Sequence, residues 1–195
     1  MEFYRLFIAL ELPAPVRLAL AEAQDLLRRA NLPVRWSLPE QMHLTLQFLG
    51  DTDPAQVPAI AAALGQAAGA SPPLRLRLAG LGAFPNTRQP SVVWAGVAGD
   101  VPALEGLAAG LGRELAGLGI AQERRPFRAH LTLGRARREA VPPEIARIGA
   151  ALATIPGPTQ VEWQAEALAL FRSQLSREGA RYTTLAHARL SGADV

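Results

Sequence analysis

The most constraining feature of this 195-residue sequence is the tetrapeptide His-Leu-Thr-Leu, which occurs at residues 43–46 and again at residues 130–133. The chain contains 3 histidines, and two of them begin this string. Given one such string, the chance from this composition that either other histidine begins a second one is roughly a few in a thousand. Each copy lies in its own half of the chain, so we interpret the sequence as a duplicated unit.

In both copies the spacing separates a polar pair from an apolar pair. Residues i and i+2 of a β-strand point to the same face of the sheet. His43 therefore shares a face with Thr45, and His130 shares a face with Thr132. The leucines point to the opposite face, where they can anchor the strand in a core. Each motif thus predicts a strand that presents an imidazole and a hydroxyl side by side.

The remaining pattern predicts strands and helices in both halves of the chain. Strands are expected over residues 4–11, 33–37, 42–49, 74–81, 91–97, 127–135, 161–174 and 180–190, with a turn at residues 177–179. Helices are expected over residues 13–30, 54–68, 101–118 and 142–153. This order predicts an α+β fold of mainly antiparallel sheets with helices packed on one side of each.

Composition narrows the class of protein. With 195 residues, of which 49% are apolar, the chain is expected to form a single domain over residues 1–195. Cysteine is absent, which excludes disulfides, cysteine zinc sites and thiol catalysis. All 20 basic residues are arginine, which excludes a lysine Schiff base and a P-loop lysine. No segment is typical of a signal peptide or a membrane span, so we expect a cytoplasmic protein.

The paired motifs suit phosphodiester chemistry. In-line displacement at phosphorus needs a base on the attacking oxygen and an acid on the leaving oxygen. One neutral and one protonated imidazole supply both near neutral pH. Threonine hydroxyls can donate to the non-bridging oxygens, and two histidines with two threonines make a poor metal site. The alternative interpretation is two strands that each carry a merely structural histidine.

At this point the sequence resembles the two-histidine (2H) phosphoesterase superfamily, and within it the RNA 2′,3′-cyclic phosphodiesterases, historically called 2′-5′ RNA ligases. Beside the two motifs, the resemblance rests on segments along nearly the whole chain, at residues 5–10, 34–36, 48–50, 81–85, 94–97, 125–128, 134–135, 173–175 and 179–182. It implies a bilobal fold with pseudo-twofold symmetry, in which two sheets face a central groove that holds both motifs.

The resemblance also implies the activity, which is metal-independent and cofactor-free hydrolysis of a terminal 2′,3′-cyclic phosphate to a 2′-phosphate. His43 and His130 are then the catalytic residues, with His130 as the base toward water and His43 as the acid toward the 3′ oxygen. Ligation would be the reverse reaction. The expected partner is RNA with a cyclic phosphate end, bound by a monomer.

Three more residues are candidates for substrate binding. Arg128 and Arg135 lie in a run of six arginines, at positions 124, 125, 128, 135, 137 and 138, that can attract an RNA backbone. The resemblance implies that Arg135 acts near the phosphate, yet strand parity puts it on the face opposite His130 unless Gly134 introduces a bulge. Phe7 shares a strand face with Ala9, where it can stack on a base or pack in the core.

Parity also assigns the neighbours of the first motif. Phe48 has the parity of Leu44 and is expected in the core, whereas Gln47 has the parity of Thr45 and is expected at the site. His187 lacks a threonine two residues on, so we interpret it as structural or exposed.

Two other functions stay open from the sequence. A phosphodiesterase of the same superfamily could act on small cyclic nucleotides. Alternatively, the chain could be a non-catalytic RNA-binding module, although both intact motifs argue against lost catalysis.

Overall fold

The computed structural model describes residues 2–121, 125–176 and 179–192. The helices are α1 (Ala14–Arg29), η1 (Pro39–Gln41), η2 (Pro54–Gln56), α2 (Val57–Gly69), α3 (Val101–Gly117) and α4 (Pro142–Thr154). The strands are β1 (Tyr4–Leu10), β2 (Val34–Trp36), β3 (Leu44–Thr52), β4 (Leu74–Phe84), β5 (Val92–Gly99), β6 (His130–Ala136), β7 (Glu162–Ala165), β8 (Ala167–Ser176) and β9 (Gly179–Arg189). Of the turn predicted at residues 177–179, residues 177–178 lie outside the described part, and Gly179 begins β9.

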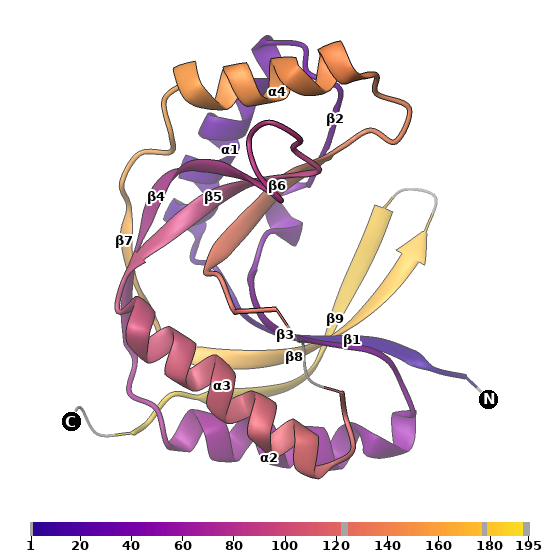
Figure 1. Cartoon of the computed structure of the whole chain (residues 1–195). Coiled ribbons are helices and arrows are strands. Elements are labelled where there is room, and N and C mark those ends of the chain that lie inside the picture. Colours follow the sequence, from indigo (N-terminus) through magenta and orange to yellow (C-terminus); the bar gives the residue numbers. More distant parts are fainter. Residues whose placement is uncertain (1, 122–124, 177–178, 193–195) are drawn as a thin grey trace.

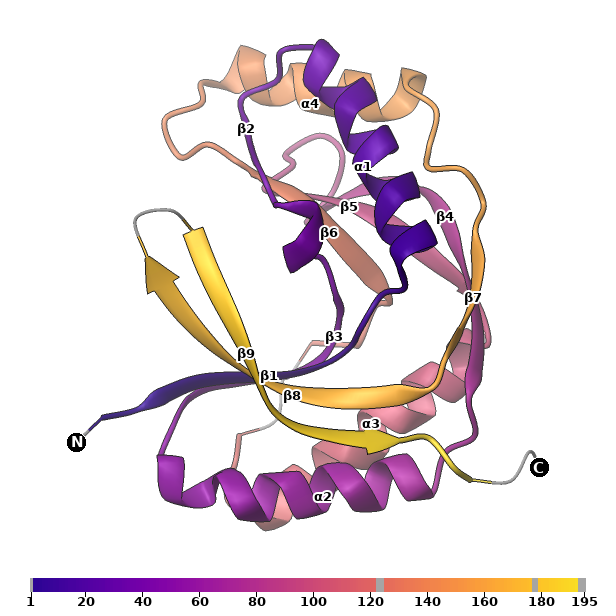
Figure 2. The ribbon, with the colours of Figure 1, turned by 180° about the vertical axis from the view of Figure 1, so that it is seen from behind.

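The strands form two sheets in which every described pair is antiparallel. One sheet has four strands in the order β3-β1-β8-β9, and the other has five in the order β2-β6-β5-β4-β7. Helices α2 and α3 lie together below the four-stranded sheet, whereas α1 and α4 lie together at the five-stranded sheet (Figures 1 and 2). The expected α+β fold with two antiparallel sheets is confirmed.

Both sheets combine strands from the two halves of the chain. In the four-stranded sheet, β1 and β3 come from the first half and β8 and β9 from the second. In the five-stranded sheet, β4 from the first half pairs with β5 and β7 from the second. Thus β4, from the first half of the chain, pairs within the sheet that holds β5 and β6, whereas β8, from the second half, pairs within the sheet that holds β1 and β3.

The motif leucines anchor both motif strands in one hydrophobic core. Leu44 and Leu131 are 0% exposed, and Leu133 is likewise fully buried. Burying a leucine side chain is worth about 1.5–3 kcal/mol, so each motif strand is fixed firmly from behind. The histidines and threonines on the other face are thus mounted on rigid backbone.

Several predicted strands differ in extent, for instance the strand expected over residues 74–81, which continues to Phe84. The expected strand 161–174 is two strands, because the chain leaves the five-stranded sheet after Ala165 and enters the other sheet at Ala167. The strand expected from residue 127 begins at His130, since the residues before it have no strand pairing. The strand expected over residues 42–49 begins at Leu44 and continues to Thr52 along β1. Among the described helices, none is long and apolar enough to cross a bilayer.

Candidate active site

His43 immediately precedes β3 and lies against aromatic rings of the four-stranded sheet. Its imidazole stacks on the Phe7 ring, with 4.5 Å between ring centroids and 25° between ring planes. Tyr182, from β9, meets the imidazole edge-on at 5.3 Å and 84°. Thr45 pairs with Ala9, next to Phe7 along the same face of β1. Three strands therefore fix the first imidazole beside its threonine.

His130 begins β6 in the five-stranded sheet. It pairs with Gly96, and Thr132 pairs with Trp94, which places both motif side chains on one face of that sheet. Phe84, from β4, meets the imidazole edge-on, with ring centroids 4.8 Å apart and 86° between ring planes. Each histidine is thus held by a neighbouring aromatic ring.

Both histidines are fixed in the same tautomer by the same local contact. The Nδ1 atom of His43 donates to the backbone oxygen of Gln41 at 2.7 Å, and Nδ1 of His130 donates to the backbone oxygen of Arg128 at 2.7 Å. A carbonyl oxygen can only accept, so Nδ1 carries the proton in each neutral ring. Nε2 is therefore left as the atom that can take or give a proton.

The two imidazoles are close enough to affect one another electrostatically. Burial lowers the pKa of His43, against the hydrogen bond to Gln41, and the charge of His130 lowers it further. Burial also lowers the pKa of His130, against the hydrogen bond to Arg128, and the charge of Arg135 adds to the decrease. Both rings are thus poised to be neutral more readily than a free histidine.

A β-bulge follows each motif threonine at the same position. Along β3, Thr45 pairs with Ala9 and Gln47 with Ile8, so Leu46 is left without an opposite residue. Along β6, Thr132 pairs with Trp94 and Gly134 with Val93, so Leu133 is left out. One extra residue reverses the alternation of the side chains that follow it, up to the next irregularity of the strand.

The second bulge resolves the parity conflict of Arg135. Arg135 pairs with Val92, which has the same parity along β5 as Trp94, the partner of Thr132. Arg135 therefore lies on the same face of the sheet as His130, because the strand has a bulge next to Gly134. Its charge also lowers the pKa of Tyr182, which burial otherwise raises. Arg135 of one sheet is thus within electrostatic reach of Tyr182 in the other.

The first bulge overturns two expectations. Phe48 pairs with Phe7 and is 59% exposed, so it lies on the site face rather than in the core. Gln47 pairs with Ile8 on the opposite face, and its Nε2 donates to the backbone oxygen of Ala108 in α3 at 2.9 Å. Counting alternate residues fails here because the bulge lies between Thr45 and these positions.

The assignment of Phe7 to base stacking is also corrected. Its side chain is 3% exposed and is surrounded by the rings of His43, Phe171, Tyr182 and Phe48. A base needs an accessible ring face, so the packing alternative describes Phe7. The Phe7 ring packs against one face of the His43 imidazole.

The other basic candidates lie at the surface. Arg128 is exposed and precedes β6, so the parity argument does not apply to its side chain, although its carbonyl orients His130. The described arginines 125, 135, 137 and 138 are likewise exposed, and Arg124 lies outside the described residues. His187 is half exposed, with its Nε2 3.8 Å from a carboxylate oxygen of Glu11. Within the described ranges, no group of three metal-binding side chains occurs.

Sequence reasoning missed two residues of this site. Tyr182 contacts His43, yet it lies in a strand distant in sequence from both motifs, and only the segment 179–182 of the family resemblance pointed to it. Phe48 could have been found by aligning the two motifs on each other, because it and Arg135 stand five residues after their histidines. The duplicated unit therefore carries a phenyl ring at one copy and a guanidinium at the other.

Comparisons with known proteins agree with this arrangement. The family model described as LigT like Phosphoesterase matches twice, over residues 10–94 and 98–182. A Thermus thermophilus protein named RNA 2′,3′-cyclic phosphodiesterase is 39% identical, covering 96% of this chain and 91% of its own. The protein of that name from Escherichia coli K12 is 31% identical, covering 93% of each chain.

Two solved structures share the fold over nearly their whole length. TT0787 of Thermus thermophilus superposes with a TM-score of 0.82 at 34% identity, covering 97% of this chain and 100% of that chain. E. coli LigT complexed with 3′-AMP gives a TM-score of 0.76 at 30% identity, covering 97% and 99%. With two copies of the family model spanning most of the sequence, the chain belongs to the LigT-like phosphoesterase family.

Proposed function

We propose that this protein is an RNA 2′,3′-cyclic phosphodiesterase that hydrolyses a terminal 2′,3′-cyclic phosphate to a 2′-phosphate by two-histidine acid–base catalysis. The observation that carries the proposal is the pair of electrostatically coupled histidines, each with Nδ1 tied to a carbonyl and Nε2 left for proton transfer. The names of the relatives in Thermus thermophilus and E. coli support the substrate class.

In this mechanism the two rings have opposite roles at one phosphorus. Neutral His130 takes a proton from water through Nε2, and the water oxygen forms a bond to phosphorus. The bond from phosphorus to the 3′ oxygen breaks, and protonated His43 donates its proton to that leaving oxygen. The product keeps its phosphate on the 2′ oxygen. The same sequence joins a 2′-5′ bond when a 5′-hydroxyl takes the place of water, because the 5′ oxygen then bonds to phosphorus as the 3′ oxygen leaves.

The charge on the non-bridging oxygens is stabilised by the neighbouring side chains. Thr45 and Thr132 lie on the same faces as their histidines and can donate hydroxyl hydrogen bonds. Arg135 joins them because of the bulge, and its guanidinium can donate two bonds to a phosphate. Neither a metal ion nor a cofactor is needed in this scheme, because protein groups supply both proton transfer and charge.

The different side chains on the two sheets determine how the substrate is oriented in the site. Phe48 offers an exposed ring on the face of His43, and aromatic rings are the usual platforms for an unstacked base. Arg135 lies on the face of His130 and attracts the phosphate. The nucleoside then lies on the side of the four-stranded sheet, which puts its 3′ oxygen next to His43 as the acid. Exposed arginines, among them Arg128, extend the contact along RNA.

A second substrate class is the small cyclic nucleotides. The structure of E. coli LigT with 3′-AMP shows a mononucleotide bound by a relative at 30% identity. The same catalytic step would then act on a substrate without an RNA chain. A non-catalytic RNA-binding role is disfavoured by the two intact motifs.

The decisive experiment offers the purified protein a short RNA with a 2′,3′-cyclic phosphate end and, separately, 2′,3′-cyclic AMP. We expect the RNA to yield only a 2′-phosphate terminus, with a higher kcat/KM than cyclic AMP. A 3′-phosphate product would contradict the assigned leaving oxygen. Equal kcat/KM for both substrates would favour the small-nucleotide function, and binding of RNA without turnover would favour the binding module. Size-exclusion chromatography tests the expected monomer, and cell fractionation tests the expected cytoplasmic location.

A further inference from the structure

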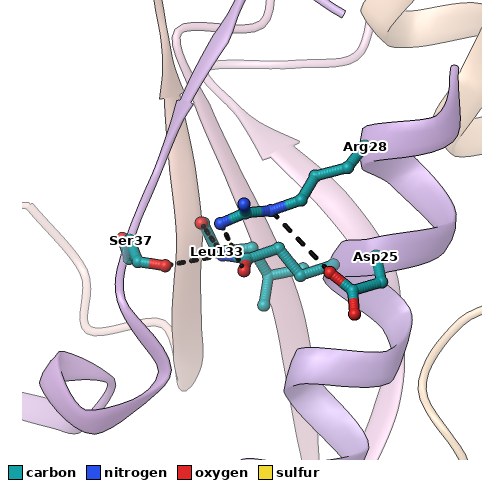
Figure 3. A network of polar contacts seen from close by, with 5 residues as sticks. Asp25, Arg28, Ser37 and Leu133 are labelled. Atoms are coloured by element: carbon teal, nitrogen blue, oxygen red, sulfur yellow. Dashed lines mark hydrogen bonds and ion pairs between the residues drawn. The ribbon is translucent and has the colours of Figure 1, made fainter. Parts of the chain in front are cut away.

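Gln24 of α1 is a buried polar side chain that bonds both to the segment after β2 and to the second motif. It is 1% exposed, and its Nε2 donates to the backbone oxygens of Ser37 at 2.8 Å and Leu133 at 2.9 Å (Figure 3). Its Oε1 accepts from Nη2 of Arg28 at 3.0 Å. An unpaired buried amide costs about 1–3 kcal/mol, so this fully paired one strongly prefers its present geometry.

Leu133, the acceptor, is the bulged residue of β6. Its carbonyl also accepts from the backbone nitrogen of Ser37 at 2.9 Å. Both donors come from α1 and the segment after β2, while the register with β5 skips Leu133. The amide of Gln24 thus holds the carbonyl in the direction that the bulge requires.

The bulge decides where Arg135 lies, because regular pairing would turn its side chain to the opposite face. We propose that Gln24 is a positioning residue for Arg135. Gln24 stabilises the β6 bulge and thereby keeps the Arg135 guanidinium on the face of His130. The inference rests on the proposed function only for what Arg135 does to the substrate. The position of the guanidinium is a separate matter that can be measured without turnover.

A double-mutant cycle between residues 24 and 135 tests the coupling. Gln24→Met keeps the length of the side chain and removes its amide. We expect Gln24→Met and Arg135→Ala each to raise KM for the cyclic phosphate roughly tenfold, the loss of one charge-assisted hydrogen bond. The double variant should be no worse than either single one, whereas independent sites would multiply their effects.

The pKa of His130, followed by NMR, is the readout without turnover. The charged groups in its surroundings are Arg135, whose charge lowers this pKa, and the coupled His43. Arg135→Ala should raise the pKa of His130, and Gln24→Met should raise it equally, with no further rise in the double variant. If wild-type protein turned over no cyclic phosphate, the proposed function would fail while this cycle still decided the role of Gln24.

Two further variants separate positioning from folding. Arg28→Met removes the donor to Oε1 from a side chain that is 43% exposed, so it should shift KM and the His130 pKa in the same direction but less. If Gln24→Met does not fold, this variant decides the matter. Gln56→Met removes a matched bridge, from Nε2 to the backbone oxygen of Leu118 at 3.3 Å, and should lower only Tm. Multiplied effects at residues 24 and 135, or an unchanged His130 pKa in folded Gln24→Met and Arg28→Met, would overturn the proposal.

Discussion

At the scale of single residues, the two candidate catalytic histidines differ in their surroundings but not in their anchoring. Both donate from Nδ1 to the carbonyl two residues before them. His43 lies among Phe7 and Tyr182, whereas His130 meets Phe84 and lies within reach of the charge of Arg135. Equal anchoring suits equal distances to a phosphorus between them, and the unequal surroundings suit unequal roles.

Replacing either histidine should abolish most turnover. General acid–base catalysis contributes roughly 10²–10⁴-fold per group, so His43→Ala and His130→Ala should each lower kcat by that order. The double variant should lose less than the product of the two, because the groups act in one step. The exposed His187 gives the matched control, and His187→Ala should leave kcat within about twofold of the wild-type value. An equal loss in that variant would contradict the assignment.

The pH profile should be bell-shaped and acid-shifted. Activity requires one neutral and one protonated ring, so kcat/KM peaks midway between two macroscopic pKa values of the pair. Burial lowers both pKa values from the ordinary 6.5, which places that peak below pH 6.5 in the free enzyme. A bound anionic phosphate favours protonation of both rings, so kcat should peak at higher pH than kcat/KM.

Initial rates across the range from acid to mildly alkaline pH, at substrate concentrations on both sides of KM, check this order of the two maxima. A kcat/KM maximum well above the ordinary histidine pKa of 6.5 would show that burial does not control these histidines. Tyr182→Ala exposes His43 to solvent, which should raise its pKa and move the maximum of kcat/KM toward neutral pH.

At the scale of elements, the bulges after the motifs decide which residues form the site. Parity along the sequence predicts the faces of His43 and Thr45 because no bulge lies between them. It fails for Gln47 and Phe48, because a bulge depends on backbone pairing that no side-chain alternation reveals. For the same reason parity alone cannot assign a face to Arg135, although Gly134 indicates where a bulge can occur. The strand expected over 161–174 failed likewise, since its two parts have different partners.

Phe48 tests the consequence of the first bulge for substrate binding. Stacking on a base is worth about 1–3 kcal/mol, so Phe48→Ala should raise KM for 2′,3′-cyclic AMP about tenfold or more, and Phe48→Trp should restore it. The effect should vanish with a ribose 2′,3′-cyclic phosphate that lacks the base. Phe3→Ala removes a ring of similar exposure, 56% against 59%, and should leave KM unchanged. A loss that is equal with and without the base would mean that Phe48 acts on the fold or on His43.

At the scale of the whole molecule, the balance of charge matters for RNA more than for a mononucleotide. The net charge is only +3, yet exposed arginines 125, 128, 135, 137 and 138 gather beside the second motif. A long substrate that lies along them releases counterions when it binds, whereas a mononucleotide releases few. The strand order that brings the second motif near the first could not be predicted from residue patterns alone, because it depends on pairing between distant segments.

Salt and a chelator test RNA binding and the catalytic step separately. Raising the salt concentration should increase KM for an RNA of about ten nucleotides much more steeply than for 2′,3′-cyclic AMP, and Arg128→Ala should flatten the RNA slope by about one unit. Excess EDTA should leave kcat unchanged for both substrates. A rate that disappears in EDTA and returns with a divalent cation would replace the two-histidine mechanism by a metal-assisted one.

The exchange of β4 and β8 between the two sheets has a meaning for the origin of the molecule. A chain that ended after β4 would lack the strands that pair with β4, and its β1 would lack the partner that β8 provides. Two copies of such a half could complete one another only as a domain-swapped homodimer. The present chain has the organisation of that homodimer with its protomers fused. Because one chain carries both halves, their side chains can differ, and the matching positions Phe48 and Arg135 make the two sides of the site chemically unequal.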